Sequence, residues 1–167
     1  MKRRYLLKTI GLASGLVVVP QLGFTEEKQT VSKFRYCLNT STISGQKSGL
    51  KKYLEIAAQA GYDSAEVWVQ DVKDYKTQGG SMQVLKKFLD DSHLAIDDAI
   101  GFAPWMVDDE QQRKAGFEQM KQEMELMAEL GCPRIAAPSA GVKQNIPLDL
   151  VNVGERYKQL LDLGRQT

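Results

Sequence analysis

The stretch Ala57–Val69, AAQAGYDSAEVWV, ends a helical pattern, turns at Gly61 and begins an apolar run typical of a buried strand. Seventy residues later, Met127–Pro138, MAELGCPRIAAP, repeats the same order of helix end, glycine and strand. A helix that turns at a glycine into a strand is the connecting unit of α/β folds. The fold class therefore depends on how often this unit recurs.

The unit occurs four times along the chain. The predicted strands are residues 34–43, 64–69, 94–102 and 134–141. The predicted helices are residues 50–60 and three segments that begin after the capping residues Ser81, Asp109 and Asp149. Strict alternation predicts right-handed crossovers and a parallel sheet flanked by helices, which is the α/β class.

The loop after the first strand favours a barrel over an open nucleotide-binding sheet. This loop, TSTISGQKSG (residues 40–49), contains neither G-x-G-x-x-G nor G-x-x-x-x-G-K-[ST]. A complete TIM barrel has eight β/α units in about 250 residues, and this chain has four units in about 135. Residues 34–167 are therefore predicted to form the N-terminal half of a TIM barrel, with two unpaired strand edges.

Residues 1–24, MKRRYLLKTIGLASGLVVVPQLGF, are predicted to be an export signal. Three basic residues precede an apolar stretch that is too short and too weakly apolar for a stable membrane span. RRYLLK resembles a twin-arginine signal, so the protein is expected to be exported to the periplasm. The alternative is the basic start of an amphipathic helix. Residues 25–33, TEEKQTVSK, are polar and are predicted to be a linker.

The overall composition argues against several classes of function. The chain is 43% apolar and 26% charged, with a formal net charge of +1. Its basic residues are scattered beyond the N-terminus, which argues against a nucleic-acid-binding surface. The single histidine, His93, follows a predicted helix end at the side of the barrel opposite the expected site. No Ser-His or Cys-His nucleophile and no zinc-type cluster can be assembled from this sequence.

Candidate binding residues follow from the rule that TIM-barrel sites lie at the C-terminal ends of the strands. Glu66 and Trp68 share one face of the second strand, and we expect this face to point into the barrel. Glu66 is interpreted as a contact to a sugar hydroxyl or a metal-bound substrate, or as a residue that orients another side chain. The alternative is a structural carboxylate paired with Lys or Arg.

The ends of the first and third strands offer further polar and aromatic side chains. Asn39 and Ser41 share a face, where they either bind a polyol or cap the following loop. Phe102 and Trp105 either form an apolar wall for the carbon face of a sugar or anchor their loop. Asp97 and Asp98 lie within the third strand, and strict alternation would point them to opposite faces, with at least one of them buried against a partner.

Four stretches together resemble the sugar phosphate isomerase/epimerase family, whose members have a xylose-isomerase-like TIM barrel. These stretches are LNTSTISGQ (38–46), AAQAGYDSAEVWV (57–69), AIGFAPWMVDD (99–109) and GCPRIAAPSAG (131–141). The resemblance covers about Phe34 to Thr167 and implies a divalent metal ion held by Glu, Asp, His and Glu residues of later strands. It also implies that two of these glutamates act as acid and base at a carbon next to a carbonyl.

None of those later-strand positions has a counterpart in this chain, so we expect neither a metal site nor a catalytic residue in it. The substrate-facing residues that the resemblance leaves are Asn39, Glu66, Trp68, Phe102 and Trp105. The chain is thus predicted to be the N-terminal half of a metal-dependent sugar isomerase or epimerase, inactive by itself. The alternative is a non-catalytic half barrel that binds carbohydrate and self-associates into a homo-oligomer.

Overall fold

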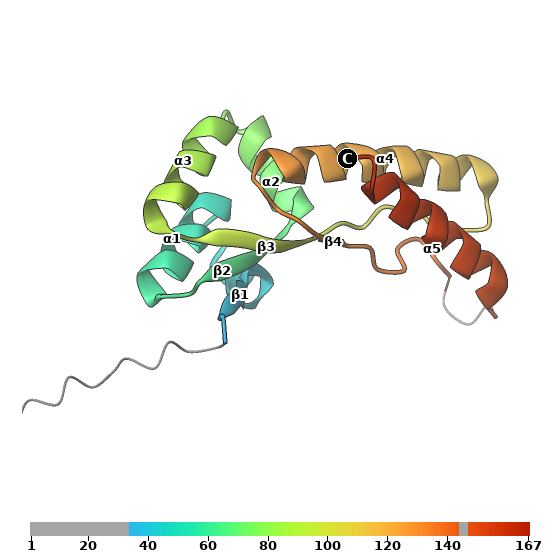
Figure 1. The fold of residues 1–167 in the computed structure, drawn as a ribbon, viewed down its shortest axis with the longest axis horizontal. Helices are drawn as coiled ribbons and strands as arrows, with labels where there is room; N and C mark the ends of the chain where they lie inside the picture. The colour runs from blue at the N-terminus through green and yellow to red at the C-terminus, as the bar shows by residue number, and fades with distance from the viewer. Residues whose placement is uncertain (1–33, 144–146) are drawn as a thin grey trace, which may run out of the picture. The chain divides into compact units, whose positions relative to one another are not determined.

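The sheet contains four parallel strands in the order of the chain. The computed structural model describes residues 34–143 and 147–167. The strands are β1 (Cys37–Asn39), β2 (Ser64–Trp68), β3 (Ala95–Ile100) and β4 (Ile135–Ala136), paired in the order β1-β2-β3-β4 (Figure 1). Every pair is parallel. The predicted α/β class, with four β/α units as in the first half of a TIM barrel, is confirmed.

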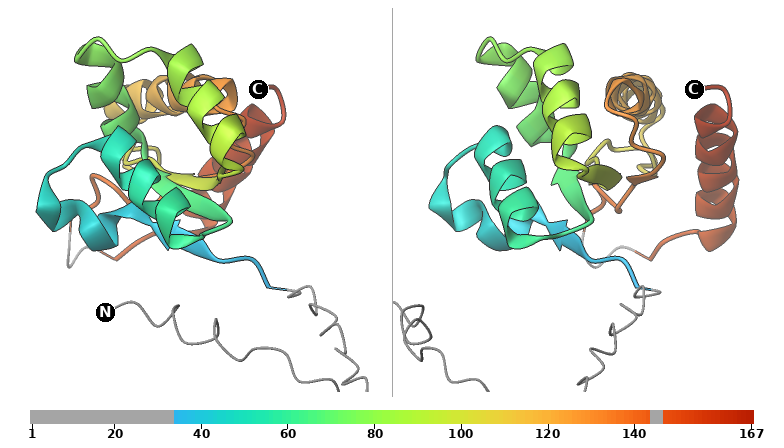
Figure 2. Two further views of the ribbon diagram at one scale, coloured as in Figure 1. Left: turned by 90° about the vertical axis from the view of Figure 1, so that its left-hand side faces the viewer. Right: turned by 60° about the vertical axis from the view of Figure 1, so that its left-hand side comes forward.

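Four long helices occur where the sequence pattern predicts them. They are α1 (Leu50–Ala60), α3 (Met82–Ser92), α4 (Glu110–Glu129) and α5 (Leu150–Gly164). The predicted caps are present, because the side chains of Ser81, Asp109 and Asp149 each accept hydrogen bonds from backbone N–H groups of the first turn. The helices follow one another around the sheet in chain order (Figure 2).

The first predicted strand, residues 34–43, is wrong beyond Asn39. Residues 40–46 form a 3₁₀ helix, η1 (Thr40–Gln46), whose N-terminus is capped by the Asn39 side chain. The Thr42 hydroxyl donates to the Asn39 carbonyl, and the Ser44 hydroxyl donates to the Ser41 carbonyl. These local side-chain bonds give the backbone an alternative to strand pairing, which the strand pattern did not take into account.

A further helix, α2 (Val69–Thr77), was not predicted. It begins directly after β2, with Trp68 at its N-cap, so Val69 is helical and not the last strand residue. Val69 and Val72 lie one helical turn apart, and both are buried. The helix is short and largely polar, so it lacks the long apolar stripe that marks the other helices in the sequence.

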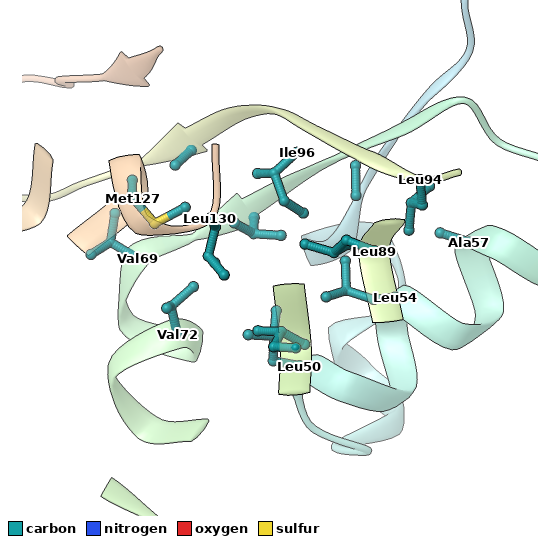
Figure 3. Packing of buried hydrophobic residues seen from close by; sticks show 14 residues of the cluster. Leu50, Leu54, Ala57, Val69, Val72, Leu89, Leu94, Ile96, Met127 and Leu130 are labelled. Carbon is teal, nitrogen blue, oxygen red and sulfur yellow. The ribbon is translucent and has the colours of Figure 1, made fainter. Parts of the chain in front are cut away.

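The main core lies between one face of the sheet and the helices (Figure 3). Ala65 and Val67 of β2 are fully buried in this core, while Glu66 between them points to the other face and is half-buried. The helices contribute leucines, valines and a methionine, among them Leu50, Leu54, Val72, Leu85, Leu89 and Met127.

A second cluster of buried residues lies beyond β3. It contains Ala103, Trp105, Met106, Met120 and Leu160, from the loop after β3, from α4 and from α5. The α5 helix is also tied to this loop because Arg156 Nη1 donates to the Met106 carbonyl at 2.6 Å. Two separate clusters therefore stabilise the first and last parts of the sheet.

A register shift in β3 overturns the expectation for Asp97 and Asp98. Ala65 pairs with Ile96 while Glu66 pairs with Asp98, so Asp97 is an extra residue in the ladder. Both aspartates are only half-buried. Asp97 Oδ1 lies 3.3 Å from Arg35 Nη2, and Asp98 Oδ1 accepts from the backbone N–H of Ala99. Neither aspartate is buried in the way that strict alternation predicted.

The predicted export signal (1–24) and linker (25–33) lie outside the described residues. Within residues 34–143 and 147–167, no helix combines the length and apolar character needed to cross a membrane. Both cysteines are free thiols, with Cys37 exposed and Cys132 half-buried.

Candidate functional site

The polar part of the candidate site is built where β1 and β2 end. Asn39 is the last residue of β1, and it is paired in register with Glu66 of β2. Asn39 Nδ2 donates to Glu66 Oε2 at 2.5 Å. The bond joins side chains on the face of the sheet that does not carry the core residues Ala65 and Val67. The fold therefore brings the side chains of Asn39 and Glu66 together, and their contact with a substrate stays a prediction.

Asn39 also performs the capping role that the sequence left open. Its Oδ1 atom accepts from the Ser41 backbone N–H at 2.9 Å and from the Ser41 hydroxyl at 2.6 Å. Thr40 is fully buried, and its hydroxyl donates to the Glu66 carbonyl at 3.1 Å. Both ends of the Asn39 amide are thus engaged, and this fixes the side chain that holds Glu66.

Glu66 keeps one carboxylate oxygen available. Its side chain is half-buried, and Asn39 is its one side-chain hydrogen-bond partner among the described residues. In the same part of the chain, no Lys or Arg lies within ion-pair distance of Glu66. Oε1 can therefore accept a hydrogen bond from a ligand hydroxyl while Oε2 stays with Asn39.

An aromatic pair lies at the ends of β2 and β3. The rings of Trp68 and Phe102 meet edge to face, with centroids 5.3 Å apart and planes at 63°. Trp68 is 37% exposed and Phe102 is 49% exposed. Edge-to-face contact stabilises such a pair, and its exposed surface offers apolar carbon and ring faces to a ligand.

Trp105 occupies a different position. It is only 5% exposed, and it belongs to the second core cluster. Its Nε1 donates to the carbonyls of Ala137 and Pro138, both at 3.1 Å, and its ring packs against Tyr157. This geometry supports the loop-anchor alternative for Trp105, and its contact with a substrate stays a prediction.

The family whose sequence pattern matches this chain is described as the xylose isomerase-like TIM barrel, and it covers residues 54–167. The chain belongs to that family. This match spans three of the four strands and all helices from the later part of α1 onward, in agreement with the parallel β/α units. Among curated proteins, no match was found.

Solved structures share the fold of this xylose isomerase-like chain at low sequence identity. IolI protein with a bound zinc atom is 20% identical with a TM-score of 0.66, and the match covers 78% of this chain and 47% of IolI. D-Psicose 3-epimerase in the presence of D-fructose is 16% identical with a TM-score of 0.63, over 80% of this chain and 49% of the epimerase.

A third structure extends the range of chemistry on this fold. The probable 3-DHS dehydratase AsbF of Bacillus anthracis, involved in petrobactin synthesis, is 16% identical with a TM-score of 0.64. The match covers 80% of this chain and 49% of AsbF. The xylose isomerase-like chain thus spans about half the length of each of these proteins.

The described residues do not fit a metal ion. No group of three or more His, Cys, Asp or Glu side chains within residues 34–143 and 147–167 is placed to hold one. At the strand ends, Glu66 is joined to the amide of Asn39 and not to a second carboxylate or a histidine. The described part of the chain therefore offers no set of side chains that could bind a metal ion.

Two titratable groups in the described chain have shifted pKa values for reasons of burial. Asp71, in the first turn of α2, has a raised pKa because it is partly buried, and the nearby Asp74 carboxylate adds to the effect. Burial likewise raises the pKa of the Cys132 thiol. A thiol with a raised pKa is less readily deprotonated to the nucleophilic thiolate.

Sequence reasoning missed an ion pair between α2 and α4 whose carboxylate is buried. Lys73 Nζ of α2 lies 2.6 Å from Glu123 Oε1 of α4, and Glu123 is only 2% exposed. A signal was present in the sequence, because Glu123 lies three residues after Met120 and four before Met127, on the inward stripe of α4. A carboxylate on an apolar stripe indicates a buried partner.

Proposed function

We propose that this chain forms the substrate-facing half of the pocket of a sugar isomerase or epimerase. The reaction is proton transfer next to a carbonyl of a small sugar or sugar-derived compound. The proposal is based on a polar residue pair and an aromatic residue pair at the ends of neighbouring strands. The Asn39–Glu66 pair offers a carboxylate oxygen, and the Trp68–Phe102 pair offers exposed aromatic faces.

This combination suits a carbohydrate because a sugar ring has hydroxyls at its edge and C–H groups on its faces. A carboxylate oxygen accepts a charge-assisted hydrogen bond from a hydroxyl, and an aromatic face packs against the C–H groups. The family and the sugar epimerase among its structural neighbours support a sugar over other polar ligands.

The proposal assigns binding to this chain and chemistry to a complementary half barrel. The divalent metal ion and the acid–base pair belong to later strands, as the family resemblance implies. The chain by itself is then expected to bind a sugar weakly and not to convert it.

The test is saturation-transfer NMR on the full 167-residue chain with D-fructose as the probe. We expect transfer from aromatic protons to the sugar, and we expect Trp68→Ala and Phe102→Ala each to abolish it. Tyr36→Ala is the matched control, because Tyr36 is an exposed aromatic residue before β1, at the opposite end of the sheet. Equal transfer in all three variants would place the sugar elsewhere and contradict the proposal.

A carbohydrate-binding half barrel that self-associates is the second candidate function. It is favoured by the two open edges of the sheet, since within residues 34–143 and 147–167 β1 pairs only with β2 and β4 pairs only with β3. A cavity of about 1090 Å³ lies beside β4 and is lined in part by Ile100, Met124 and Leu161. Sedimentation of the full chain distinguishes the candidates: a dimer at micromolar concentration supports this alternative, and a monomer contradicts it.

We also propose that the protein is exported by the twin-arginine pathway, on the basis of the RRYLLK sequence alone. Replacing both Arg3 and Arg4 by Lys keeps the charge and removes the guanidinium pair. Cell fractionation is expected to show the variant in the cytoplasm and the parent protein in the periplasm. Lys2→Arg is the control, and normal export of the double variant would contradict the assignment.

A further inference from the structure

Glu123 places a carboxylate in the buried part of the fold, where it forms an ion pair with the partly exposed Lys73. Glu123 Oε1 accepts from Lys73 Nζ at 2.6 Å and from Gln119 Nε2 at 2.7 Å. Its other oxygen, Oε2, is buried without a hydrogen-bond partner among the described residues. Replacing such a pair by apolar side chains is often neutral or stabilising, so stability alone does not account for it.

The unpaired oxygen faces Gly101. A side chain at position 101 would clash with Glu123 Oε2 and would lie 3.2 Å from Ile135 Cδ1. Gly101 follows the last residue of β3, and its backbone N–H donates to the Ala136 carbonyl of β4 at 3.0 Å. The carboxylate thus lies directly against the backbone at the end of β3.

The pair therefore connects the two segments that carry the exposed aromatic residues. Lys73 belongs to α2, and the residue at the N-cap of α2 is Trp68. Gly101, against which Glu123 packs, directly precedes Phe102. Lys73 is therefore part of the helix whose N-cap is Trp68, and Glu123 lies against the backbone that leads into Phe102.

We propose that Lys73 and Glu123 are positioning residues that hold Trp68 and Phe102 in their edge-to-face arrangement. The expected effect on sugar binding rests on the proposed function, in which the sugar packs against the aromatic pair. Neither residue is assigned a contact with the sugar. An ion pair suits this role because its hydrogen bond is directional, and the second hydrogen bond from Gln119 orients the Glu123 carboxylate that Lys73 contacts.

The test replaces the pair while preserving the core. The double variant Lys73→Met with Glu123→Leu is compared with Lys87→Ala with Asp91→Ala. The second pair is a matched control, because Lys87 and Asp91 form an ion pair of similar length, 2.7 Å, that is exposed on α3. Both proteins carry 5-fluorotryptophan, so ¹⁹F NMR reports Trp68 and Trp105 separately, with Trp68→Phe assigning the two resonances.

In the Lys73/Glu123 double variant, we expect the melting temperature to be kept and the Trp68 resonance to shift or broaden. The Trp105 resonance should stay in place, and D-fructose binding should weaken by about 3- to 10-fold, the scale of one aromatic contact. The exposed-pair control should change neither resonance. A lower melting temperature with an unmoved Trp68 resonance would show a merely structural pair and overturn the proposal.

Two milder variants cover the case in which the double variant does not fold. Glu123→Gln keeps the shape but removes the charge, and it should move the Trp68 resonance in the same direction. Lys73→Arg keeps the charge, and its spectrum should match that of the parent protein. An unmoved Trp68 resonance in Glu123→Gln, together with a shifted one in Lys73→Arg, would overturn the proposal. If these shifts occur in a parent protein that does not bind D-fructose, the positioning role stands and the proposed sugar site is wrong.

Discussion

Asn39 and Glu66 lie 27 residues apart in the chain, and their side chains meet in a 2.5 Å hydrogen bond across the β1–β2 pair. The same asparagine caps η1 through its other amide atom, so the loop after β1 and the carboxylate on β2 are held by one side chain. Any change to Glu66 therefore tests binding and loop geometry together.

We predict that Glu66→Gln keeps the fold and weakens sugar binding. The amide oxygen of glutamine can still accept from Asn39 Nδ2, and no ion pair is lost among the described residues. Affinity for D-fructose should fall about 10-fold, the scale of one lost charge-assisted hydrogen bond. NMR titration and thermal melting measure the two effects. Glu55→Gln on α1 is the control, and a large drop in melting temperature with unchanged binding would reassign Glu66 to a structural role.

Trp105→Phe should have the opposite profile. The substitution removes the indole N–H and leaves the carbonyls of Ala137 and Pro138 without this donor. We expect a loss of about 1–3 kcal/mol in the free energy of unfolding, with unchanged sugar affinity. Urea denaturation and the same NMR titration provide the measurements. A selective loss of affinity would instead return Trp105 to the sugar-binding wall.

Two helix glycines should respond to alanine in opposite directions. A Cβ atom at Gly116 of α4 would lie 2.7 Å from the backbone carbonyl of Pro104, so Gly116→Ala should destabilise the protein by about 1–3 kcal/mol. Gly154 of α5 has no atom within 4 Å of its added Cβ, so Gly154→Ala should stabilise by about 0.5–1 kcal/mol. Urea denaturation compares them, and equal effects would mean that α4 does not approach the loop after β3 so closely.

The partial burial of Asp71 predicts a pH-dependent gain from Asp71→Asn. Burial, with a smaller contribution from Asp74, raises the pKa of Asp71 in the folded protein above its usual 3.8. The folded state then binds more protons than the unfolded state in the window just above that value, so this group lowers stability as pH rises through the window. Below the window both states are protonated, and the group has no effect.

The stability advantage of Asp71→Asn should therefore be absent near pH 3 and should grow toward pH 7. Urea denaturation of parent and variant across this range measures the difference. Glu110→Gln, which removes an exposed carboxylate from the first turn of α4, controls for a charge lost at a helix N-terminus. An advantage that is constant with pH would show that the carboxylate is not responsible.

The sequence predicted the elements whose signals are local and periodic. The apolar stripes of α1 and α3, the caps Ser81, Asp109 and Asp149 and the glycine turns were sufficient to predict four β/α units. These features depend on regular geometry, which a residue pattern encodes directly. The sequence placed Asn39 and Glu66 each at a strand end, but it did not predict the hydrogen bond that joins their side chains.

Features that depend on tertiary packing could not be predicted in this way. The register shift at Asp97 reflects how β3 fits its neighbours, and no single-residue signal marks it. The burial of Trp105 depends on carbonyls more than thirty residues later in the chain. Lys73 and Glu123 lie 50 residues apart on two helices. The position of Glu123 on an apolar stripe indicated a buried carboxylate, but nothing in the sequence identified Lys73 as its partner.

The two core clusters divide the described chain into parts that can open separately. Among the described hydrophobic residues, Ile135 of β4 packs against both clusters. Cooperative opening follows buried contacts, so α5 and the loop after β3 should exchange their amide hydrogens through a lower-energy opening than β2 and α1. Asn39, Glu66 and Trp68 belong to the elements around the first cluster, so the candidate site should lie in the part of the chain with the slower amide exchange.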